Sequence, residues 1–270
     1  MNDDRKGAAL ITGASAGIGA TYADRLARRG HDLILVARDG ERLEALAVKL
    51  RAETGVKAEA FRADLTDKTD VARVADRLAS DGAIDLLINN AGVAAFGDFA
   101  QADIERLGAM IDLNVVALAR LAHAASGAFA ARGHGTIINI GSVVGLMPEF
   151  RSAVYGATKA FVLYLTQAMA VELKDKGVRL QAVLPGATYT EIWDRSGHGS
   201  EGLDPNRTMS VGELVDAALA GLDGGELVSI TSLPDPADWD ALQAARLKLA
   251  PNLSRAHPAP RYGVKVREPV

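Results

Sequence analysis

Tyr155 and Lys159, four positions apart in the chain, are the residues whose types and spacing most readily suggest chemistry. On a helix, residues at this spacing share one face and lie close together. A nearby ammonium lowers the pKa of a tyrosine from about 10, which makes the phenol a usable acid or base near neutral pH. Taken alone, the pattern Tyr-x-x-x-Lys is common and usually marks only one face of a helix.

Ser142 is a second candidate for chemistry. It follows the apolar run Thr136–Ile140, at the carboxyl end of a predicted strand, where open α/β folds bind ligands. The alternative is that its hydroxyl only caps a helix or a turn.

A glycine-rich segment, Thr12–Gly19, follows the first apolar run and opens the first helical pattern. Glycines let the backbone approach a pyrophosphate, and the helix N-terminus presents free N–H groups to it. The spacing is Gly-x-x-x-Gly-x-Gly, one residue longer in its first gap than the usual dinucleotide fingerprint. The segment predicts a dinucleotide site; the alternative is a tight turn that uses glycine for steric reasons.

The second apolar run ends at Ala37, without the acidic residue that would bind the 2′-hydroxyl of NAD(H), and Arg38 follows. An arginine at this place accommodates the 2′-phosphate of NADP(H). Asp39 is predicted to cap the next helix. NADP(H) is therefore the favoured cofactor, and NAD(H) is the alternative. The alternative role for Arg38 is that of a solvated charge in a loop.

The elements that must position these residues alternate along the chain. Short Ile/Leu/Val-rich runs are typical of strands buried on both faces of a parallel sheet, and apolar residues every three or four positions are typical of helices. The predicted strands are Ala8–Thr12, Leu33–Ala37, Ala58–Arg62, Leu86–Asn89, Thr136–Ile140, Leu180–Leu184 and Leu227–Thr231. The predicted helices are Ala16–Arg29, Arg42–Thr54, Thr69–Ser80, Ile104–Arg132 and Val154–Lys176. The alternation predicts an α/β fold, a Rossmann-type doubly wound parallel sheet of about seven strands flanked by helices.

The organisation changes after Pro185, where the periodicity disappears and Gly, Ser, Asp, Asn and Pro accumulate. Residues 190–210 are predicted to form a mobile substrate lid after the sixth strand, with a plain surface loop as the alternative. Residues 232–270 hold a short helical pattern and a tail. Because the motifs are interleaved along one sheet, 1–270 is expected to form a single domain.

Composition excludes several classes of function. The 270 residues include 30 Lys and Arg against 34 Asp and Glu, and this net charge of −4 argues against a nucleic-acid partner. The absence of cysteine excludes disulfides and thiolate chemistry, and the scattered histidines show no ligand spacing, so no metal is expected. The sequence lacks a secretory signal and an apolar run of membrane-spanning length, which predicts a soluble cytoplasmic protein with no membrane partner.

The motifs together resemble the short-chain dehydrogenase/reductase superfamily, in its short single-domain branch, in both order and approximate spacing. The matching segments are Thr12–Gly19, Asp64, Asn89–Gly92, Asn114, Ser142 with Tyr155 and Lys159, and Pro185–Gly186. One departure is Gly141, since many members have Ser-Ser where this chain has Gly-Ser, but the reactive serine is kept. An extended-branch epimerase or dehydratase would need a longer substrate domain and a different glycine spacing.

The resemblance implies a catalytic set of four residues. Tyr155 would donate a proton to a carbonyl oxygen during reduction and remove it during oxidation, and Ser142 would hydrogen-bond that oxygen. Lys159 would lower the pKa of Tyr155 and bind the nicotinamide ribose, while Asn114 would hold a water in a proton relay that reaches Lys159. The cofactor would supply the hydride. The protein would orient the reactants and supply an acid of suitable pKa.

The resemblance also implies cofactor contacts from several strand ends. Asp64 matches the residue that hydrogen-bonds the adenine, with Leu65 beside the ring, and Asn90 matches one that contacts the adenosine side and stabilises the sheet centre. The expected cofactor-binding set is Gly13, Ser15, Ala16, Gly17, Ile18, Gly19, Arg38, Asp64, Leu65, Asn90, Ala91, Gly92, Tyr155, Lys159, Pro185, Gly186, Thr188 and Thr190.

The residues expected around the substrate carbonyl follow Ser142, the Asn89–Gly92 turn and Pro185. They are Ala94, Phe96, Val143, Val144, Leu146, Met147, Tyr189, Ile192 and Trp193. Since they are mostly apolar and include no Arg or Lys, an apolar or aromatic ketone, aldehyde or alcohol is expected rather than a small charged acid.

The sequence therefore predicts an NADP(H)-dependent carbonyl reductase or alcohol dehydrogenase. The alternative function is a non-catalytic NAD(P)-sensing protein with the same fold. Family members commonly pair the helices that match Ile104–Arg132 and Val154–Lys176, so a homodimer or homotetramer is expected.

Overall fold

The computed structural model of the chain describes residues 6–196, 199 and 201–264. Gly197, His198 and Ser200 of the expected lid, and 265–270 of the tail, lie outside the described residues. The chain divides into two compact units, Met1–Thr231 and Ser232–Val270. The single-domain organisation expected for 1–270 stays a prediction.

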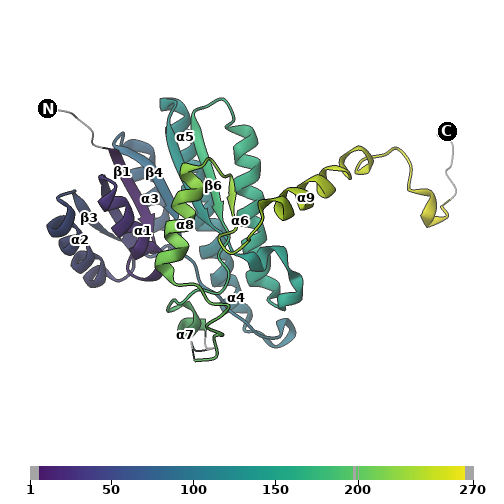
Figure 1. Ribbon diagram of the computed structural model, residues 1–270, viewed down its shortest axis with the longest axis horizontal. Helices are drawn as coiled ribbons and strands as arrows, with labels where there is room; N and C mark the ends of the chain where they lie inside the picture. Colours follow the sequence, from purple (N-terminus) through teal and green to yellow (C-terminus); the bar gives the residue numbers. More distant parts are fainter. Residues whose placement is uncertain (1–5, 197–198, 200, 265–270) are drawn as a thin grey trace. The chain divides into compact units, whose positions relative to one another are not determined.

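Parallel strands form one sheet in the order β3-β2-β1-β4-β5-β6-β7 (Figure 1). The strands are β1 (Lys6–Thr12), β2 (His31–Ala37), β3 (Ala58–Arg62), β4 (Ile84–Asn89), β5 (Gly135–Ile140), β6 (Val178–Val183) and β7 (Val228–Ser229). The strand order reverses between β1 and β4, which is the switch point where doubly wound folds bind ligands. The seven-stranded doubly wound sheet predicted from the sequence is thus confirmed.

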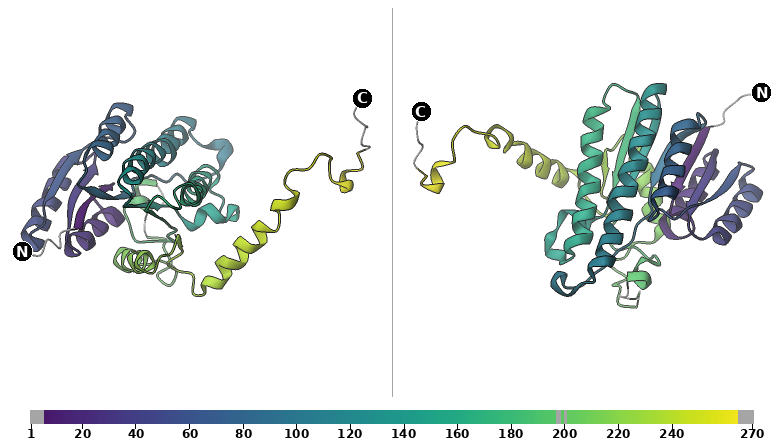
Figure 2. Two further views of the ribbon diagram at one scale, coloured as in Figure 1. Left: turned by 90° about the horizontal axis from the view of Figure 1, so that it is seen from above. Right: turned by 180° about the vertical axis from the view of Figure 1, so that it is seen from behind.

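Helices cover both faces of this sheet (Figure 2). The helices of the unit Met1–Thr231 are α1 (Gly17–Arg28), α2 (Gly40–Thr54), α3 (Lys68–Ser80), α4 (Ile104–Ile111), α5 (Leu118–Arg132), α6 (Ala153–Glu172), α7 (Ile192–Ser196) and α8 (Val211–Asp223). Short 3-10 turns lie at Phe99–Gln101, Val143–Leu146 and Pro148–Phe150.

Two apolar layers result, because successive side chains of a strand point to opposite faces of the sheet. From β1, Ala9 and Ile11 pack with α1, α2 and α8, whereas Ala8 and Leu10 pack with α3, α5 and α6. The first layer is visible in front in Figure 1, and the second in the right panel of Figure 2. Strands buried on both faces explain why their sequences are continuous apolar runs.

Most predicted boundaries lie within a few residues of the observed ones, but α8 was not predicted. Its first turn contains a capping box, in which Ser210 accepts a hydrogen bond from the Glu213 backbone and the Glu213 carboxylate accepts one from the Ser210 backbone. The pattern Ser-x-x-Glu before an apolar run was the available signal. The predicted end of one other helix was also wrong: α6 ends at Glu172, whereas the sequence pattern predicted a helix that continues to Lys176.

The stretch Ile104–Arg132 is continuous but not uniform, since a π-helical turn at Asp112–Ala117 separates α4 from α5. By length and composition this stretch could cross a membrane, and within the described chain it is the one helix of that kind. Leu121, Ala125 and Phe129 of α5 are buried between the sheet and α3. The stretch is therefore a core helix of the sheet layer.

The second unit contains α9 (Pro236–Leu247), whose first turn is capped by Asp235. None of the α9 residues is buried, and Leu242, Leu247, Leu249 and Leu253 are more than half exposed.

The carboxyl ends of the strands form one edge of the sheet, because their registers align. Thr12 pairs with Val36, Asn89 with Asn139, and Ile140 with Val183. The segments that follow these strand ends carry most residues predicted to bind ligands.

Candidate active site

The glycine-rich segment lies between β1 and α1. Gly17, the first residue of α1, has φ of +54°, a conformation that only glycine adopts readily. A Cβ added to Gly19 would lie 2.4 Å from the carbonyl oxygen of Gly13, so the helix start and the loop pack too closely for a side chain. The glycines therefore keep side chains away from the loop backbone, so that a ligand can approach it closely.

The N-terminus of α1 has no side-chain cap and no acidic residue in its first turn. The helices α2, α3, α4, α8 and α9 each begin with an Asp or Ser side chain that accepts a backbone N–H. The first N–H groups of α1 and the positive end of its dipole thus suit an external anion. This loop, which includes Ser15, Ala16 and Ile18, fits the pyrophosphate of a dinucleotide.

Thr12 and Asn90 tie the ends of β1 and β4 together. The Thr12 hydroxyl donates to the Ile88 carbonyl at 3.2 Å and accepts from the backbone of Asn90 and Ala91 at 2.9 and 3.0 Å. The Asn90 amide donates to the Thr12 carbonyl at 2.9 Å. The glycine loop is thereby fixed against the turn at Ala91 and Gly92.

The ends of β2 and β3 lie next to each other. Arg38 is exposed, and the Arg62 Nε donates to its carbonyl at 3.2 Å. Asp39 accepts the backbone N–H of Arg42 at 3.0 Å, so it is the helix cap that the sequence predicts.

Asp64, at the end of β3, is half-buried and accepts two hydrogen bonds from Thr66. The Leu65 side chain packs into the apolar core against α3 instead of standing open beside Asp64. Roles for both residues next to an adenine ring stay predictions.

Tyr155 and Lys159 occupy consecutive turns near the start of α6 and are both buried. The Lys159 Nζ donates to the Ile140 carbonyl at 2.9 Å and lies 5.8 Å from the centre of the Tyr155 ring. Ser142, just after β5, accepts from the Val144 backbone at 3.2 Å and hydrogen-bonds Tyr155. Its hydroxyl also lies 3.3 Å from the Pro185 carbonyl, its acceptor. Ser142 is therefore both a turn cap and a neighbour of the phenol.

Burial shifts the pKa of each reactive group toward its neutral form. It raises the pKa of Tyr155 to about 12, and the hydrogen bond with Ser142 only partly offsets that rise. It lowers the pKa of Lys159 to about 8. The role expected of Lys159 in lowering the Tyr155 pKa stays a prediction.

Asn114 lies in the π-helical turn, a type of helix irregularity that is frequent at functional sites. Its amide oxygen accepts from the Val93 backbone at 3.0 Å, and its amide nitrogen donates to the Val93 carbonyl at 2.9 Å and to the Thr158 hydroxyl at 3.2 Å. A Cβ on Gly92 would lie 3.1 Å from the Asn114 oxygen and 3.7 Å from the Lys159 Nζ. Asn114 and Lys159 thus meet at Gly92.

An aromatic cluster covers Tyr155. The Phe96 ring lies 5.6 Å from Tyr155, edge to face, and 5.6 Å from Trp193, nearly parallel at 9°. The Trp193 Nε1 donates to the Thr188 carbonyl at 2.8 Å. Ala94 and Ile192 pack in the same cluster. Residues from the ends of β4 and β6 therefore form one apolar wall beside the phenol.

The segment after β6 crosses the glycine loop. The Thr188 hydroxyl donates to the Gly186 carbonyl at 3.1 Å. The backbone of Thr188 also forms an isolated parallel β-bridge with Met209. A Cβ on Gly17 would lie 3.5 Å from the Thr190 methyl group. The mobile lid expected at 190–210 stays a prediction; in the described part, Arg106 of α4 donates to the Ser196 carbonyl at 3.2 Å.

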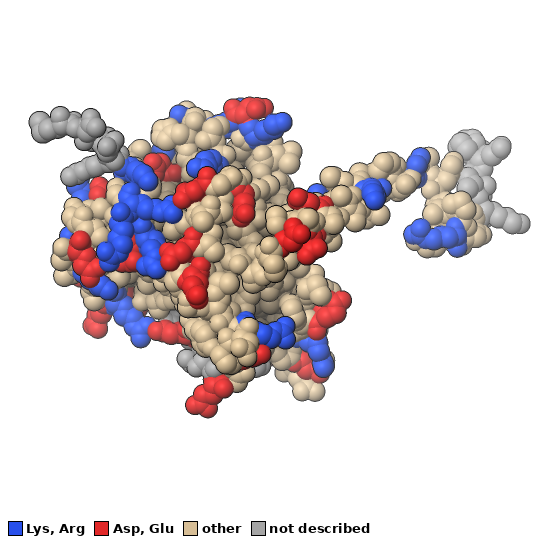
Figure 3. Space-filling view, in the orientation of Figure 1, with Lys and Arg blue, Asp and Glu red and all other residues tan. Residues whose placement is uncertain are grey.

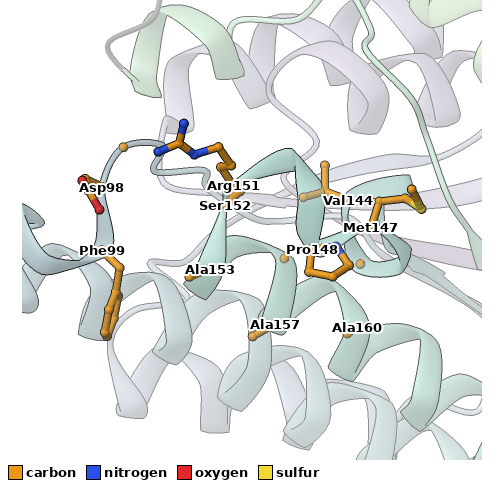
Figure 4. Close-up of a pocket in the computed structure, with 13 residues that line it drawn as sticks. Asp98, Phe99, Val144, Met147, Pro148, Arg151, Ser152, Ala153, Ala157 and Ala160 are labelled. Atoms are coloured by element: carbon orange, nitrogen blue, oxygen red, sulfur yellow. The ribbon is translucent and has the colours of Figure 1, made fainter.

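The other residues predicted to surround the substrate stay predictions, and Val144 packs in the same apolar cluster as Tyr155. Tyr189 is 45% exposed and Met147 is 45% exposed. Met147 and Val144 line a hollow of about 720 Å³ whose lining includes neither Tyr155 nor Ser142. Figure 4 shows these two side chains and Phe99 on opposite sides of the hollow, with Ala157 and Ala160 of α6 along it. Val143 and Leu146 are half-buried in the turn between β5 and this hollow.

Sequence reasoning did not single out several residues that organise the site. Thr12 could have been recognised as a polar residue at the end of a buried strand. Thr158 could have been recognised because it lies one helical turn from Tyr155. The contact of Val93 with Asn114 is made by its backbone, so the residue type carried no signal.

Comparison with known proteins agrees with this geometry. The sequence model of the short chain dehydrogenase family matches residues 7–201. A short-chain dehydrogenase from Sphingobium yanoikuyae, solved in complex with NADPH, is 55% identical, with a TM-score of 0.92 over 95% of this chain and 99% of that one.

Two further relatives are similar over most of the chain. The bulky-bulky ketone specific alcohol dehydrogenase from Comamonas testosteroni is 48% identical, with a TM-score of 0.88 over 95% of this chain and 98% of that one. An uncharacterised oxidoreductase of Staphylococcus saprophyticus is 31% identical over 83% of this chain and 94% of that protein. The matched family model, the sheet order and these relatives show that the chain belongs to the short-chain dehydrogenase family and is an oxidoreductase.

Proposed function

We propose that this protein is an NADP(H)-dependent carbonyl reductase and alcohol dehydrogenase for apolar or aromatic substrates. The observation that carries the proposal is the buried Tyr155 phenol, which lies beside Ser142 and packs against Phe96, itself stacked on Trp193. An acid beside an aromatic wall suits a carbonyl with apolar substituents. The similar enzyme from Comamonas testosteroni, described as specific for bulky-bulky ketones, supports this substrate class.

The residues present fit the proposed cofactor. The uncapped N-terminus of α1 and the close-packed glycine loop would hold the pyrophosphate, and Arg38 the 2′-phosphate. Asp64 and Asn90 would lie on the adenosine side, and Pro185, Gly186, Thr188 and Thr190 on the nicotinamide side. NADPH, when bound, supplies the hydride. The NADPH complex of the Sphingobium yanoikuyae relative supports this cofactor for the present chain.

The catalytic roles follow from proton positions. With a pKa of about 12, Tyr155 holds its proton at neutral pH and can donate it to a carbonyl oxygen during reduction. Ser142 would orient that oxygen. Lys159 would bind ribose hydroxyls with the N–H groups not used by the Ile140 carbonyl, and Asn114 would hold the water that reaches Lys159.

The deciding experiment follows NADPH oxidation with a panel of ketones by the wild type, Tyr155→Phe and Tyr164→Phe. Tyr164 lies on the same helix but is exposed, so its variant controls for loss of a tyrosine hydroxyl. We expect Tyr155→Phe to lower kcat/KM by ~10³-fold while NADPH still binds. Tight NADPH binding with no turnover of any carbonyl by the wild type would favour the non-catalytic sensor. A strong preference for small keto acids over diaryl ketones would refute the substrate class.

The assembly and location of the protein remain predictions. A homodimer or homotetramer is expected through the helices around Ile104–Arg132 and on α6, where Phe161, Tyr164 and Val171 expose apolar surface. A cytoplasmic location is expected from the sequence.

A further inference from the structure

Arg42 and Glu191, which are 149 residues apart, form an ion pair between the segment after β2 and the segment after β6. Arg42 lies in the first turn of α2, just after the end of β2. Its Nη1 donates to both carboxylate oxygens of Glu191, at 3.1 and 3.2 Å. The pair therefore joins the adenosine side of the site to the segment that follows β6.

The surroundings of the pair place it where a ribose phosphate is expected. The Arg42 Nε lies 3.4 Å from the carboxylate of Asp39, which directly follows Arg38. On the other side, Thr190 precedes Glu191 and lies against Gly17 of the glycine loop. The Arg42 guanidinium thus contacts Asp39, just after β2, and Glu191, whose neighbour Thr190 lies against the glycine loop; this is the region that holds the ribose in this class of fold.

The ion pair is weak enough to exchange. The Arg42 and Glu191 side chains are 52% and 46% exposed, and pairs at such exposure contribute about 0–1 kcal/mol. A phosphate dianion offers a guanidinium shorter, charge-assisted and often bidentate hydrogen bonds. A 2′-phosphate at this place would therefore compete well with Glu191 for Arg42.

We propose that Arg42 is a second determinant of NADP(H) preference, beside Arg38, and that Glu191 is its internal competitor. This inference rests on the proposed use of NADP(H). When the phosphorylated cofactor binds, Arg42 exchanges the Glu191 carboxylate for the 2′-phosphate. NAD(H), which lacks that phosphate, leaves the ion pair in place. Because Glu191 is two residues from Trp193, the exchange also frees the segment that carries the aromatic wall from its tie to α2.

The test measures dissociation constants of NADPH and NADH, by titration calorimetry, for the wild type, Arg42→Gln, Glu191→Gln and the double variant. We expect Arg42→Gln to weaken NADPH binding about tenfold, the loss of one charge-assisted contact, and to change NADH binding less than twofold. Glu191→Gln should strengthen NADPH binding several-fold. In the Arg42→Gln background, the same Glu191 change should have no effect.

Each outcome decides between distinct ideas. If Glu191→Gln strengthens NADPH binding equally with and without Arg42, Glu191 acts only by general repulsion, and the exchange is refuted. If Arg42→Gln leaves NADPH binding unchanged, Arg42 is not a determinant, although the proposed function still stands. If the wild type binds neither nucleotide, both proposals fail. Glu172→Gln, at an exposed carboxylate at the end of α6, controls for the loss of one negative charge and should not alter binding.

Discussion

At the scale of single residues, burial decides the protonation of the reactive pair. Tyr155 and Lys159 are shifted in opposite directions, to pKa values of about 12 and about 8, and in both cases desolvation is the largest cause. The Lys159 Nζ has one carbonyl acceptor, from Ile140, so its ammonium form is buried with little compensation. The site thus keeps Lys159 at the expense of stability, as functional sites often do.

This predicts that Lys159→Met is much less active but more stable at pH 7. Because the folded pKa of Lys159 is about 8 and its ordinary value is 10.5, the unfolded chain binds more protons between these pH values. The wild type therefore gains stability as the pH rises through this window, and the variant does not. We expect Lys159→Met to raise Tm by ~3 °C at pH 7, with a smaller difference at pH 10.

Differential scanning calorimetry at the two pH values measures this effect, and Lys174→Met is the control at an exposed lysine. A variant that is less stable than the wild type at pH 7, or a Tm difference that grows toward pH 10, would contradict the argument. The kcat/KM of Lys159→Met should fall ~10²-fold or more.

At the scale of elements, capping side chains determine where helices begin. An irregular helical turn determines where one functional side chain points. The π-helical turn at Asp112–Ala117 places Asn114 within hydrogen-bond distance of the Val93 backbone and of Thr158, which lies on α6. The Asp39 cap begins α2 next to Arg38, and the Ser210 capping box begins α8 after the segment that follows β6. Caps therefore fix the chain on both sides of the site.

Ser210→Ala is predicted to destabilise the protein through α8. The change removes the hydroxyl that accepts from the Glu213 backbone, and such a loss costs about 1 kcal/mol. For a domain of this size, Tm should fall by ~2–4 °C, measured by thermal denaturation. Ser126→Ala is the matched control, because the Ser126 hydroxyl bonds the Ala122 carbonyl inside α5 and caps nothing. Equal losses in both variants would show that the cap has no particular effect.

At the scale of the whole molecule, the unit Met1–Thr231 contains both apolar layers, and its surface charges are mixed. Arg25 pairs with Asp216 at 2.7 Å and Arg29 with Asp223 at 3.0 Å, which links α1 to α8. Figure 3 shows Lys and Arg interspersed with Asp and Glu over this face. Exposed pairs of this kind contribute little, so the apolar layers supply most of the stability.

Self-association through α6 is predicted to depend on its exposed apolar residues. Tyr164 and Val171 are 76% and 77% exposed, and a charge on either would oppose burial against a second copy. We expect Tyr164→Arg with Val171→Arg to lower the oligomeric state, measured by size-exclusion chromatography with light scattering. Val48→Arg, at a 52% exposed position of α2, should leave it unchanged. A wild type that is already monomeric would refute the predicted assembly.

The sequence by itself determined much of this protein. The sheet, the glycine loop, the Asp39 cap and the order of Ser142, Tyr155 and Lys159 follow from patterns between near neighbours. Hydrophobic periodicity, helix capping and the conformational freedom of glycine depend on residues that are close in sequence. They can therefore be recognised in the sequence without knowledge of the tertiary structure.

Only the tertiary structure decided the direction of the Tyr155 pKa, the stack of Phe96 on Trp193 and the pairing of Arg42 with Glu191. The physical reason is that desolvation and side-chain contact depend on which strand ends become neighbours in the sheet. That arrangement brings together residues as much as 149 positions apart, and no local pattern records it.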